Sequence, residues 1–371
     1  MSITAYKSTE LLKKAQDGKR ISEEEALYLW LNADFKEMGI TAHHLKNRVC
    51  AANRVSYTLF RIINYTNLCN VDCSFCSFKE PLEKENEKDS SNNTTRSASA
   101  YTLTKEQILN KIDEAYKKYD CHQVFIQGGV NPEIPYEYYI DLLKSVHNAY
   151  PDIHIRAFSP VEVFSLAQSN GLGVDRVFDD LINAGLNSFP GAGAEILTER
   201  MRSELSEKKI PVKDWYEVMK TALSKGLKAS TNIVWGSTET PEEIIEHLSL
   251  IRKLQDETNN VLSFVPWTFQ QQTKDFTVRH VPSYEYLKMI ALSRIFLDNI
   301  PNIEVSIMVK GPAVGELALF FGANDINSPV LEENVLRSYG LRSEAEAIEF
   351  IENAGFTPIR RNFNFEYDKK S

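Results

Sequence analysis

The stretch that decides the architecture is Cys69-Asn70-Val71-Asp72-Cys73-Ser74-Phe75-Cys76, which follows a segment rich in β-branched and aromatic residues at 55–63. The cysteines have the spacing C-x3-C-x2-C, and Asn70 and Asp72 make the loop too polar for a packed core. Three thiolates on one loop are suited to three irons of a cubane iron–sulfur cluster, which leaves the fourth iron without a protein ligand. Such an open iron is able to bind a small molecule and pass an electron to it.

A structural zinc site is the alternative that these residues leave open. Zinc in such a site normally has four protein ligands, and His43, His44 and His122 have no finger-like spacing to the cysteine loop. Cys50 or Cys121 could supply a fourth ligand, although we interpret both as ordinary packed thiols. A disulfide framework is disfavoured, because the five cysteines are an odd number and three of them are crowded together.

Outward from the cysteine loop, the chain alternates between strand-like and helix-like segments. Helix start signals are present at Thr104 with Gln107, and at Thr240 ahead of Pro241 and Glu243. Alternating strands and helices are typical of parallel βαβ units, and eight strands favour a closed barrel over an open doubly wound sheet, the alternative. The predicted strands are 55–63, 124–126, 154–158, 186–189, 228–235, 261–267, 304–309 and 317–321.

The chain of 371 residues divides into three expected parts. These are an N-terminal helical extension at 1–50, a barrel at 51–325 with a polar insertion at 83–100, and a C-terminal helical segment at 326–371 packed on the barrel. The net charge of −9 argues against binding to nucleic acid phosphates. We expect no membrane span and no secretory signal, and therefore a cytoplasmic protein.

On these motifs the chain is identified as a member of the radical S-adenosylmethionine (SAM) superfamily, which combines this cysteine spacing with an aromatic residue before the last cysteine. Further stretches resemble the group that contains the futalosine-pathway menaquinone enzymes and the deazaflavin (F420 precursor) synthase. The resemblance implies an α/β fold, a (β/α) barrel whose six-unit core is extended to a full or nearly full TIM barrel. The stretches are 63–67, 126–132, 158–162, 190–196, 254–258, 297–303, 321–325, 332–335 and 354–358.

The resemblance also implies cofactors and site residues. A [4Fe–4S] cluster would be bound by Cys69, Cys73 and Cys76, and SAM by residues at the ends of the strands. Glycines suit that site because they let the backbone approach a ligand closely, and an arginine fork matches a carboxylate. The SAM-binding residues implied are Tyr65, Gln127, Gly128, Gly129, Ser159, Glu195, Arg200, Arg202 and Gly236, with Glu162 beside Ser159; the catalytic residues implied are Glu239 and Ser237.

The reaction that the resemblance implies is reductive cleavage of SAM to a 5′-deoxyadenosyl radical, with a small electron donor such as flavodoxin or ferredoxin. Within the group, 332–335 and 354–358 are most similar to the enzymes that cyclise dehypoxanthine futalosine, an aromatic nucleoside-type substrate with a benzoate ring. Trp235, Trp267 and Phe269 are candidate apolar neighbours of that ring, or core residues.

One departure from the family pattern lies in the run Gly236-Ser237-Thr238-Glu239-Thr240. Relatives usually have histidine where this chain has Ser237, so a hydrogen-bonding imidazole is missing. Another enzyme of the same group therefore stays an alternative: an aminofutalosine synthase, a deazaflavin synthase component or a paralogue with a changed substrate.

Overall fold

The computed structural model describes residues 3–50, 53–82, 99–270, 276–332, 341 and 343–367. Its centre is a sheet of eight parallel strands in the spatial order β8-β7-β6-β5-β4-β3-β2-β9. From β2 to β8, strands adjacent in the sheet are also consecutive in sequence, as repeated βα units require. The strands are β2 (Phe60–Asn64), β3 (Gln123–Gln127), β4 (His154–Ala157), β5 (Ser188–Pro190), β6 (Lys228–Trp235), β7 (Val261–Thr268), β8 (Asn302–Ile303) and β9 (Val330–Leu331).

The segment around Asp325 joins the two sides of this curled sheet. Asp325 makes single-residue parallel bridges with Glu304, directly after β8, and with Ser56. The backbone N–H of Val305 donates to Asp325 O (2.8 Å), and the N–H of Ile326 donates to Ser56 O (3.1 Å). The Asp325 segment, which leads into β9, thus connects the β8 edge of the curled sheet with the segment of Ser56 that precedes β2. This arrangement confirms the predicted barrel and argues against the open doubly wound sheet.

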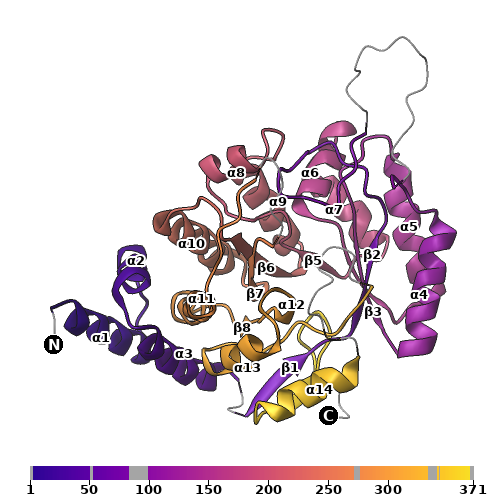
Figure 1. The fold of residues 1–371 in the computed structure, drawn as a ribbon. Helices are drawn as coiled ribbons and strands as arrows, with labels where there is room; N and C mark the ends of the chain where they lie inside the picture. Colours follow the sequence, from indigo (N-terminus) through magenta and orange to yellow (C-terminus); the bar gives the residue numbers. More distant parts are fainter. Residues whose placement is uncertain are drawn as a thin grey trace.

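Helices surround the strands (Figure 1). Each lies between two strands of the sheet in sequence and buries apolar residues, as in other barrels of this class. They are α4 (Lys105–Tyr119), α5 (Tyr136–Ala149), α6 (Pro160–Ser169), α7 (Val174–Asn183), α8 (Glu199–Leu205), α9 (Val212–Ser224), α10 (Pro241–Thr258) and α11 (Ser283–Phe296), followed by α12 (Ile307–Lys310) and α13 (Pro312–Phe320) between β8 and β9.

The two ends of the chain lie outside the ring. Helices α2 (Glu23–Asn32) and α3 (Phe35–Val49) pack against α10 and α11, and α1 (Ile3–Gln16) packs on α2 and α3. Strands β1 (Arg54–Tyr57) and β10 (Thr357–Arg360) form a separate parallel pair beside α14 (Glu344–Asn353). The expected 326–371 segment thus contributes β9 and β10 as well as a helix.

Local sequence signals account for several of these elements. Thr104 and Thr240 both form capping boxes, with Gln107 and Glu243 three residues on. In β6, buried residues alternate with partly buried ones along the whole strand, which is the period-two pattern of a strand with two different faces. The predicted bounds of β6 are confirmed.

Two predicted strands are wrong. The 304–309 segment contains the end of the ladder at Glu304 and then helix α12, and the strand itself is the two-residue β8 just before it. The 317–321 segment is helical through Phe320, as the end of α13, which begins with Pro312 at its first position. Both segments are short apolar runs, and such runs fit a buried helix as well as a buried strand.

The polar insertion expected at 83–100 falls almost entirely outside the described residues. Within the described ranges, the search for a helix both long and apolar enough to cross a bilayer found none.

Candidate active site

The three cysteines lie on a loop that begins after β2, at the carboxyl end of the barrel strands. The backbone N–H of Ser74 donates to Leu205 O (2.8 Å), which ties this loop to the end of α8. The N–H of Cys76 donates to Cys73 O (3.2 Å), so the last two cysteines share one turn. The thiols of Cys69, Cys73 and Cys76 form no disulfide and are partly exposed. Active sites of such barrels form at this end of the strands.

An aromatic wall and a lysine surround the middle of the loop. The ring of Phe75 lies 5.2 Å from that of Phe269 and 6.0 Å from that of Phe276. The Lys209 ammonium lies 3.7 Å from Cys73 Sγ. Burial raises the pKa of Cys73 to about 11, and Lys209 opposes that rise. Iron deprotonates the thiols that bind it, and the ammonium then offsets negative charge on the thiolates.

Three thiols on one loop are the donor set of a cubane cluster. Within the part of the chain that the structure describes, no group of three His, Cys, Asp or Glu side chains is placed to hold one metal ion. A structural zinc site needs four ligands around a single ion. A cubane cluster spreads its cysteine ligands over different irons, which suits three thiols spaced along a loop.

Gly128 and Gly129 form the turn after β3 and lie against the start of the cysteine loop. A Cβ added to Gly129 would stand 2.2 Å from Leu68 O and 3.0 Å from Cys69 Cβ. A Cβ added to Gly128 would stand 2.7 Å from the ring of Tyr65. Only glycine fits here, so the turn and the cysteine loop form one closely packed unit with bare backbone at its surface.

A buried carboxylate holds this unit from behind. Glu162 Oε1 accepts hydrogen bonds from the Tyr65 hydroxyl (2.8 Å) and from the Gly128 N–H (3.1 Å). Glu162 Oε2 accepts from the Ser159 hydroxyl (2.6 Å). Burial raises the pKa of Glu162 to about 7, and these hydrogen bonds limit the rise. Tyr65 and Ser159 therefore act in this structure through Glu162, as positioning residues for the glycine turn.

The glycine-rich turn after β5 is braced by Arg202. This buried guanidinium donates from Nη1 to Gly193 O and Ala194 O (both 3.1 Å) and from Nε to Ile210 O (2.5 Å). Its Nη2 is buried without a hydrogen-bond partner among the described residues. A buried N–H group without an acceptor costs free energy. The Nη2 group of Arg202 is therefore available to hydrogen-bond a ligand beside the turn.

Glu195 follows the same turn and forms a buried ion pair. Its Oε2 lies 2.7 Å from the Lys209 ammonium, and both side chains are almost fully buried. Lys209 thus stands between Glu195, one of the predicted SAM-binding residues, and Cys73 of the cysteine loop.

Arg200 lies apart from this group. Its side chain is 49% exposed and forms ion pairs with Glu204 (2.8 Å) and Glu243. It also donates to Thr238 O (3.1 Å). The two predicted arginines therefore differ in place: Arg202 is buried beside the glycine-rich turn, and Arg200 forms an ion-pair network at the surface.

Gly236, Ser237 and Glu239 form a compact turn after β6. Glu239 accepts from the backbone N–H groups of Gly236 and Ser237, each at 2.8 Å. The Ser237 hydroxyl donates to Thr277 O (3.0 Å). Gly236 has φ +99°, a left-handed conformation that favours glycine. In this structure the Glu239 carboxylate thus holds the turn.

A cavity of about 320 Å³ opens inside the ring between these groups. Residues of β2 to β7 and of β9 line it, among them Gln127, Glu195, Asn232 and Trp267. Of the candidate tryptophans, Trp267 lies in the wall of this cavity. Trp235 does not, because its ring packs edge-on against Trp30 at 5.9 Å. The candidate Phe269 belongs to the aromatic wall of the cysteine loop.

Two site residues were not predicted from the sequence. Lys209 follows another lysine in a polar stretch that resembles any exposed turn, so no signal marks it. Arg156 stands between Ile155 and Ala157 in a predicted strand, and a charge within a buried strand was a usable signal. The structure places Arg156 in the cavity wall.

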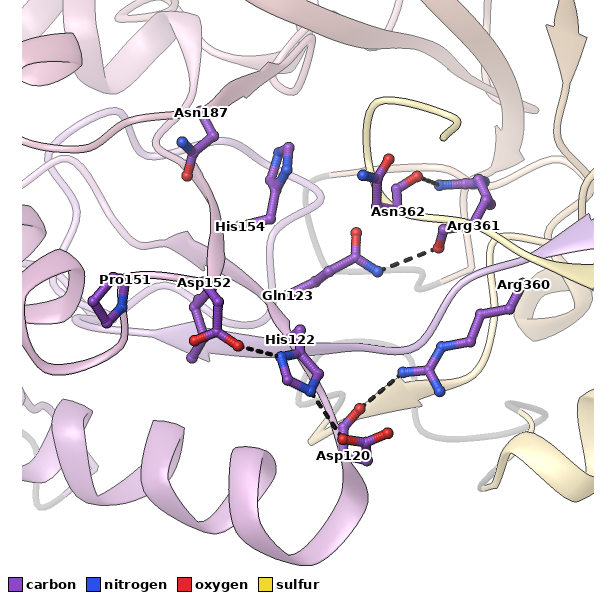
Figure 2. A pocket seen from close by; sticks show the side chains of 11 residues that line it. Asp120, His122, Gln123, Pro151, Asp152, His154, Asn187, Arg360, Arg361 and Asn362 are labelled. Carbon is purple, nitrogen blue, oxygen red and sulfur yellow. Dashed lines mark hydrogen bonds and ion pairs between the residues drawn. The ribbon is translucent and has the colours of Figure 1, made fainter. Parts of the chain in front are cut away.

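A second hollow, of about 630 Å³, lies at the opposite end of the ring. Its lining residues Gln123 and His154 are the first residues of β3 and β4. Figure 2 shows His122 between Asp152 (2.8 Å) and Asp120 (2.9 Å). These polar side chains bond to one another, and the predicted site residues are all elsewhere.

Fold and site together define a barrel enzyme with a three-cysteine loop at the carboxyl end of its strands. Residues 63–251 match the model of the radical SAM superfamily, and the chain belongs to that superfamily. Its cofactors are therefore a [4Fe–4S] cluster and SAM. Residues 258–371 match a second family described as the CofH/MqnC C-terminal region. The predicted superfamily and group are confirmed.

Relatives with two different activities have the same sequence identity to this chain. A cyclic dehypoxanthine futalosine synthase from Halalkalibacterium halodurans is 35% identical over 96% of this chain and 94% of its own length. A 5-amino-6-(D-ribitylamino)uracil–L-tyrosine 4-hydroxyphenyl transferase from Methanocaldococcus jannaschii is also 35% identical, over 92% of this chain and 96% of its own length.

Solved structures support the barrel fold. The hydrogenase maturase HydG from Carboxydothermus hydrogenoformans superposes with a TM-score of 0.73 over 96% of this chain and 80% of its own, at 16% identity. Methylornithine synthase superposes with a TM-score of 0.67 over 94% of this chain and 97% of its own, at 18% identity.

Proposed function

We propose that this protein cyclises dehypoxanthine futalosine in menaquinone biosynthesis. The observation that carries the proposal is the full-length similarity to the cyclic dehypoxanthine futalosine synthase of Halalkalibacterium halodurans. The site supports it, because Gln127, the glycine-rich turn after β5 and Trp267 line one cavity, and the turn that follows Gln127 packs on the cysteine loop through Gly129. An aromatic nucleoside requires such a partly apolar cavity with a few polar groups.

The two cofactors fit the residues present. When bound, the cluster and SAM supply an electron and a 5′-deoxyadenosyl radical that removes a hydrogen from the substrate ribose. Cys69, Cys73 and Cys76 would hold the cluster. The tight packing of Gly129 against the cysteine loop fixes the two binding surfaces relative to each other.

SAM would be held by groups around the glycine turns. The backbone of Gln127, Gly128 and Gly129 would receive its amino group, with Tyr65 and Ser159 holding that turn through Glu162. Glu195 would accept from the ribose hydroxyls, and Arg202 would donate its remaining N–H groups to the carboxylate. Arg200 would do so only after leaving its surface carboxylates.

The turn after β6 would face the adenosyl end of SAM. Gly236 provides close backbone approach, and Glu239 holds the orientation of the turn. We keep Glu239 and Ser237 as the candidate catalytic residues. Ser237 would hydrogen-bond there in place of the histidine usual in relatives.

A second candidate activity is transfer of the 4-hydroxyphenyl group of tyrosine to 5-amino-6-(D-ribitylamino)uracil. The equal identity of the transferase from Methanocaldococcus jannaschii favours it. Both reactions need the same cofactors and the same cysteine loop, so the difference lies in the substrate that the cavity accepts.

The test is a substrate comparison with anaerobically reconstituted protein, dithionite and SAM. Parallel reactions receive dehypoxanthine futalosine, tyrosine with 5-amino-6-(D-ribitylamino)uracil, or an enolpyruvyl-benzoate, and products are identified by mass spectrometry. We expect the cyclised product in the first reaction only. Product in the second or third alone would reassign the protein to the transferase or to an aminofutalosine synthase.

In the cell we propose that flavodoxin or ferredoxin supplies the electron. We also propose a cytoplasmic location, where free thiols persist and reduced electron carriers are present.

A further inference from the structure

Arg156 lies deep in the cavity, below the ends of the strands. Its neighbours in β4, Ile155 and Ala157, are fully buried against the core, and strand alternation turns Arg156 to the inside of the ring. Its register partner is Phe125, two residues before the end of β3 at Gln127. At about 3.3 Å per residue, Arg156 lies roughly 7 Å below the strand ends.

The guanidinium of Arg156 has more donors than protein acceptors. It donates from Nε to Ser188 Oγ (3.2 Å), from Nη1 to Ser230 Oγ (3.4 Å) and from Nη2 to Phe363 O (3.2 Å). A guanidinium has five N–H groups, so these three long bonds leave two without an acceptor among the described residues. Arg294, equally buried but not in the cavity wall, makes four bonds to oxygens.

The charge of Arg156 has no close counterion. Across the described residues, no carboxylate oxygen lies within the 4.0 Å of an ion pair with it. The acidic groups that act on its charge, Asp325 and Glu304, both pair with Arg361, at 2.6 Å and 3.8 Å. Burial lowers the pKa of Arg156 to about 9 and raises that of Glu304. The guanidinium lies over the Phe363 ring, 4.0 Å from its centre. A buried cation without an anionic partner is still unfavourable, and this one is only 7% exposed.

We infer that Arg156 is the residue that recognises a carboxylate on the substrate, held at the floor of the cavity. Its two remaining N–H groups are suited to paired hydrogen bonds with carboxylate oxygens. Phe125 and Trp267 line the same cavity, so the carboxylate would be carried by an aromatic ring. This inference rests on the proposed function, because the benzoate of dehypoxanthine futalosine is such a group.

The test compares a charged and an uncharged fragment. Binding of benzoate and of benzamide to the anaerobically reconstituted protein is measured by ligand-observed NMR. We expect the wild type to bind benzoate about tenfold or more tighter than benzamide, as a charge-assisted hydrogen bond implies. Arg156→Gln removes that preference, Arg156→Lys keeps part of it, and Arg176→Gln, an exposed arginine of α7, leaves it unchanged.

Equal binding of the two fragments by the wild type overturns the inference. So does an unchanged preference in a folded Arg156→Gln protein. If that variant does not fold, the benzoate preference of the wild type and of Arg156→Lys tests the inference instead, and an unchanged preference in Arg156→Lys counts against it. The proposed function fails separately: a benzoate preference that depends on Arg156, without cyclised product from dehypoxanthine futalosine, retains the carboxylate site and rejects the reaction.

Discussion

Replacing Gly129 with alanine tests whether the glycine turn and the cysteine loop are one packed unit. The new methyl carbon would lie 2.2 Å from Leu68 O, whereas ordinary contacts begin at 3.4 Å. The carbonyl must therefore retreat by 1.2 Å, and Cys69 directly follows it. The turn cannot easily yield instead, because the Gly129 N–H donates to Thr66 O at 2.9 Å.

The expected cost follows from this clash. Forcing one extra methyl group into a close-packed site costs about 1–3 kcal/mol, and weakening the backbone hydrogen bond adds about 1 kcal/mol. We therefore expect the free energy of unfolding to fall by about 2–4 kcal/mol. Movement of the first cysteine should also lower the amount of iron that each chain retains.

The assay is urea unfolding of the iron-free protein together with iron content after reconstitution. Gly173→Ala is the matched control, because a Cβ there meets no atom within 4 Å and the backbone is not left-handed. We expect that control to stay within about 1 kcal/mol of the wild type. Wild-type stability and iron content in Gly129→Ala would refute the packing argument.

Three further predictions concern single side chains. Cys73→Ala should lose most of its iron and all 5′-deoxyadenosine formation, while Cys121→Ala keeps both; equal loss would show that any buried thiol matters. Glu162 has a pKa of about 7 in the folded protein, above its ordinary 4.5, so it favours folding below pH 4.5 and loses this contribution as pH rises to 7. Relative to Glu162→Gln, the wild type should lose about 3 kcal/mol of unfolding free energy between pH 4.5 and 8, and parallel pH profiles would contradict this. Lys209→Met should cost about 3–5 kcal/mol because it leaves a buried carboxylate unpaired; Lys208→Met, on the exposed neighbour, should cost less than 1 kcal/mol, and similar urea curves for the two would be inconsistent with a buried pair.

Much of the fold could be predicted because strands and helices alternate regularly along the barrel, and each has its own spacing of buried residues. β6 was predicted over its full length, since its two faces differ along all eight residues. The helix starts at Thr104 and Thr240 were predicted because capping is local chemistry. The end of α13 was missed, because its last four residues are all apolar although Leu317 and Phe320 are exposed, so the segment lacks the polar face of a surface helix and resembles a strand.

The candidate site was predictable where one short segment contains the chemistry. The cysteine spacing and the pair Gly128-Gly129 are contiguous in sequence, so their meaning is visible without a structure. Lys209 acquires its place only by tertiary packing, when the loop after α8 is folded against the cysteine loop. Arg156 required knowledge of which face of β4 turns inward.

The residues that complete the floor of the barrel, Arg361 and Phe363, come late in the chain. Phe363 accepts a hydrogen bond from Arg156, and Arg361 pairs with Asp325, where the ring of strands closes. These residues leave the ribosome after every strand of the ring. The floor of the cavity therefore depends on the last residues of the chain: a chain cut before Arg361 would keep the cysteine loop and the strands but lose these contacts to Arg156 and Asp325.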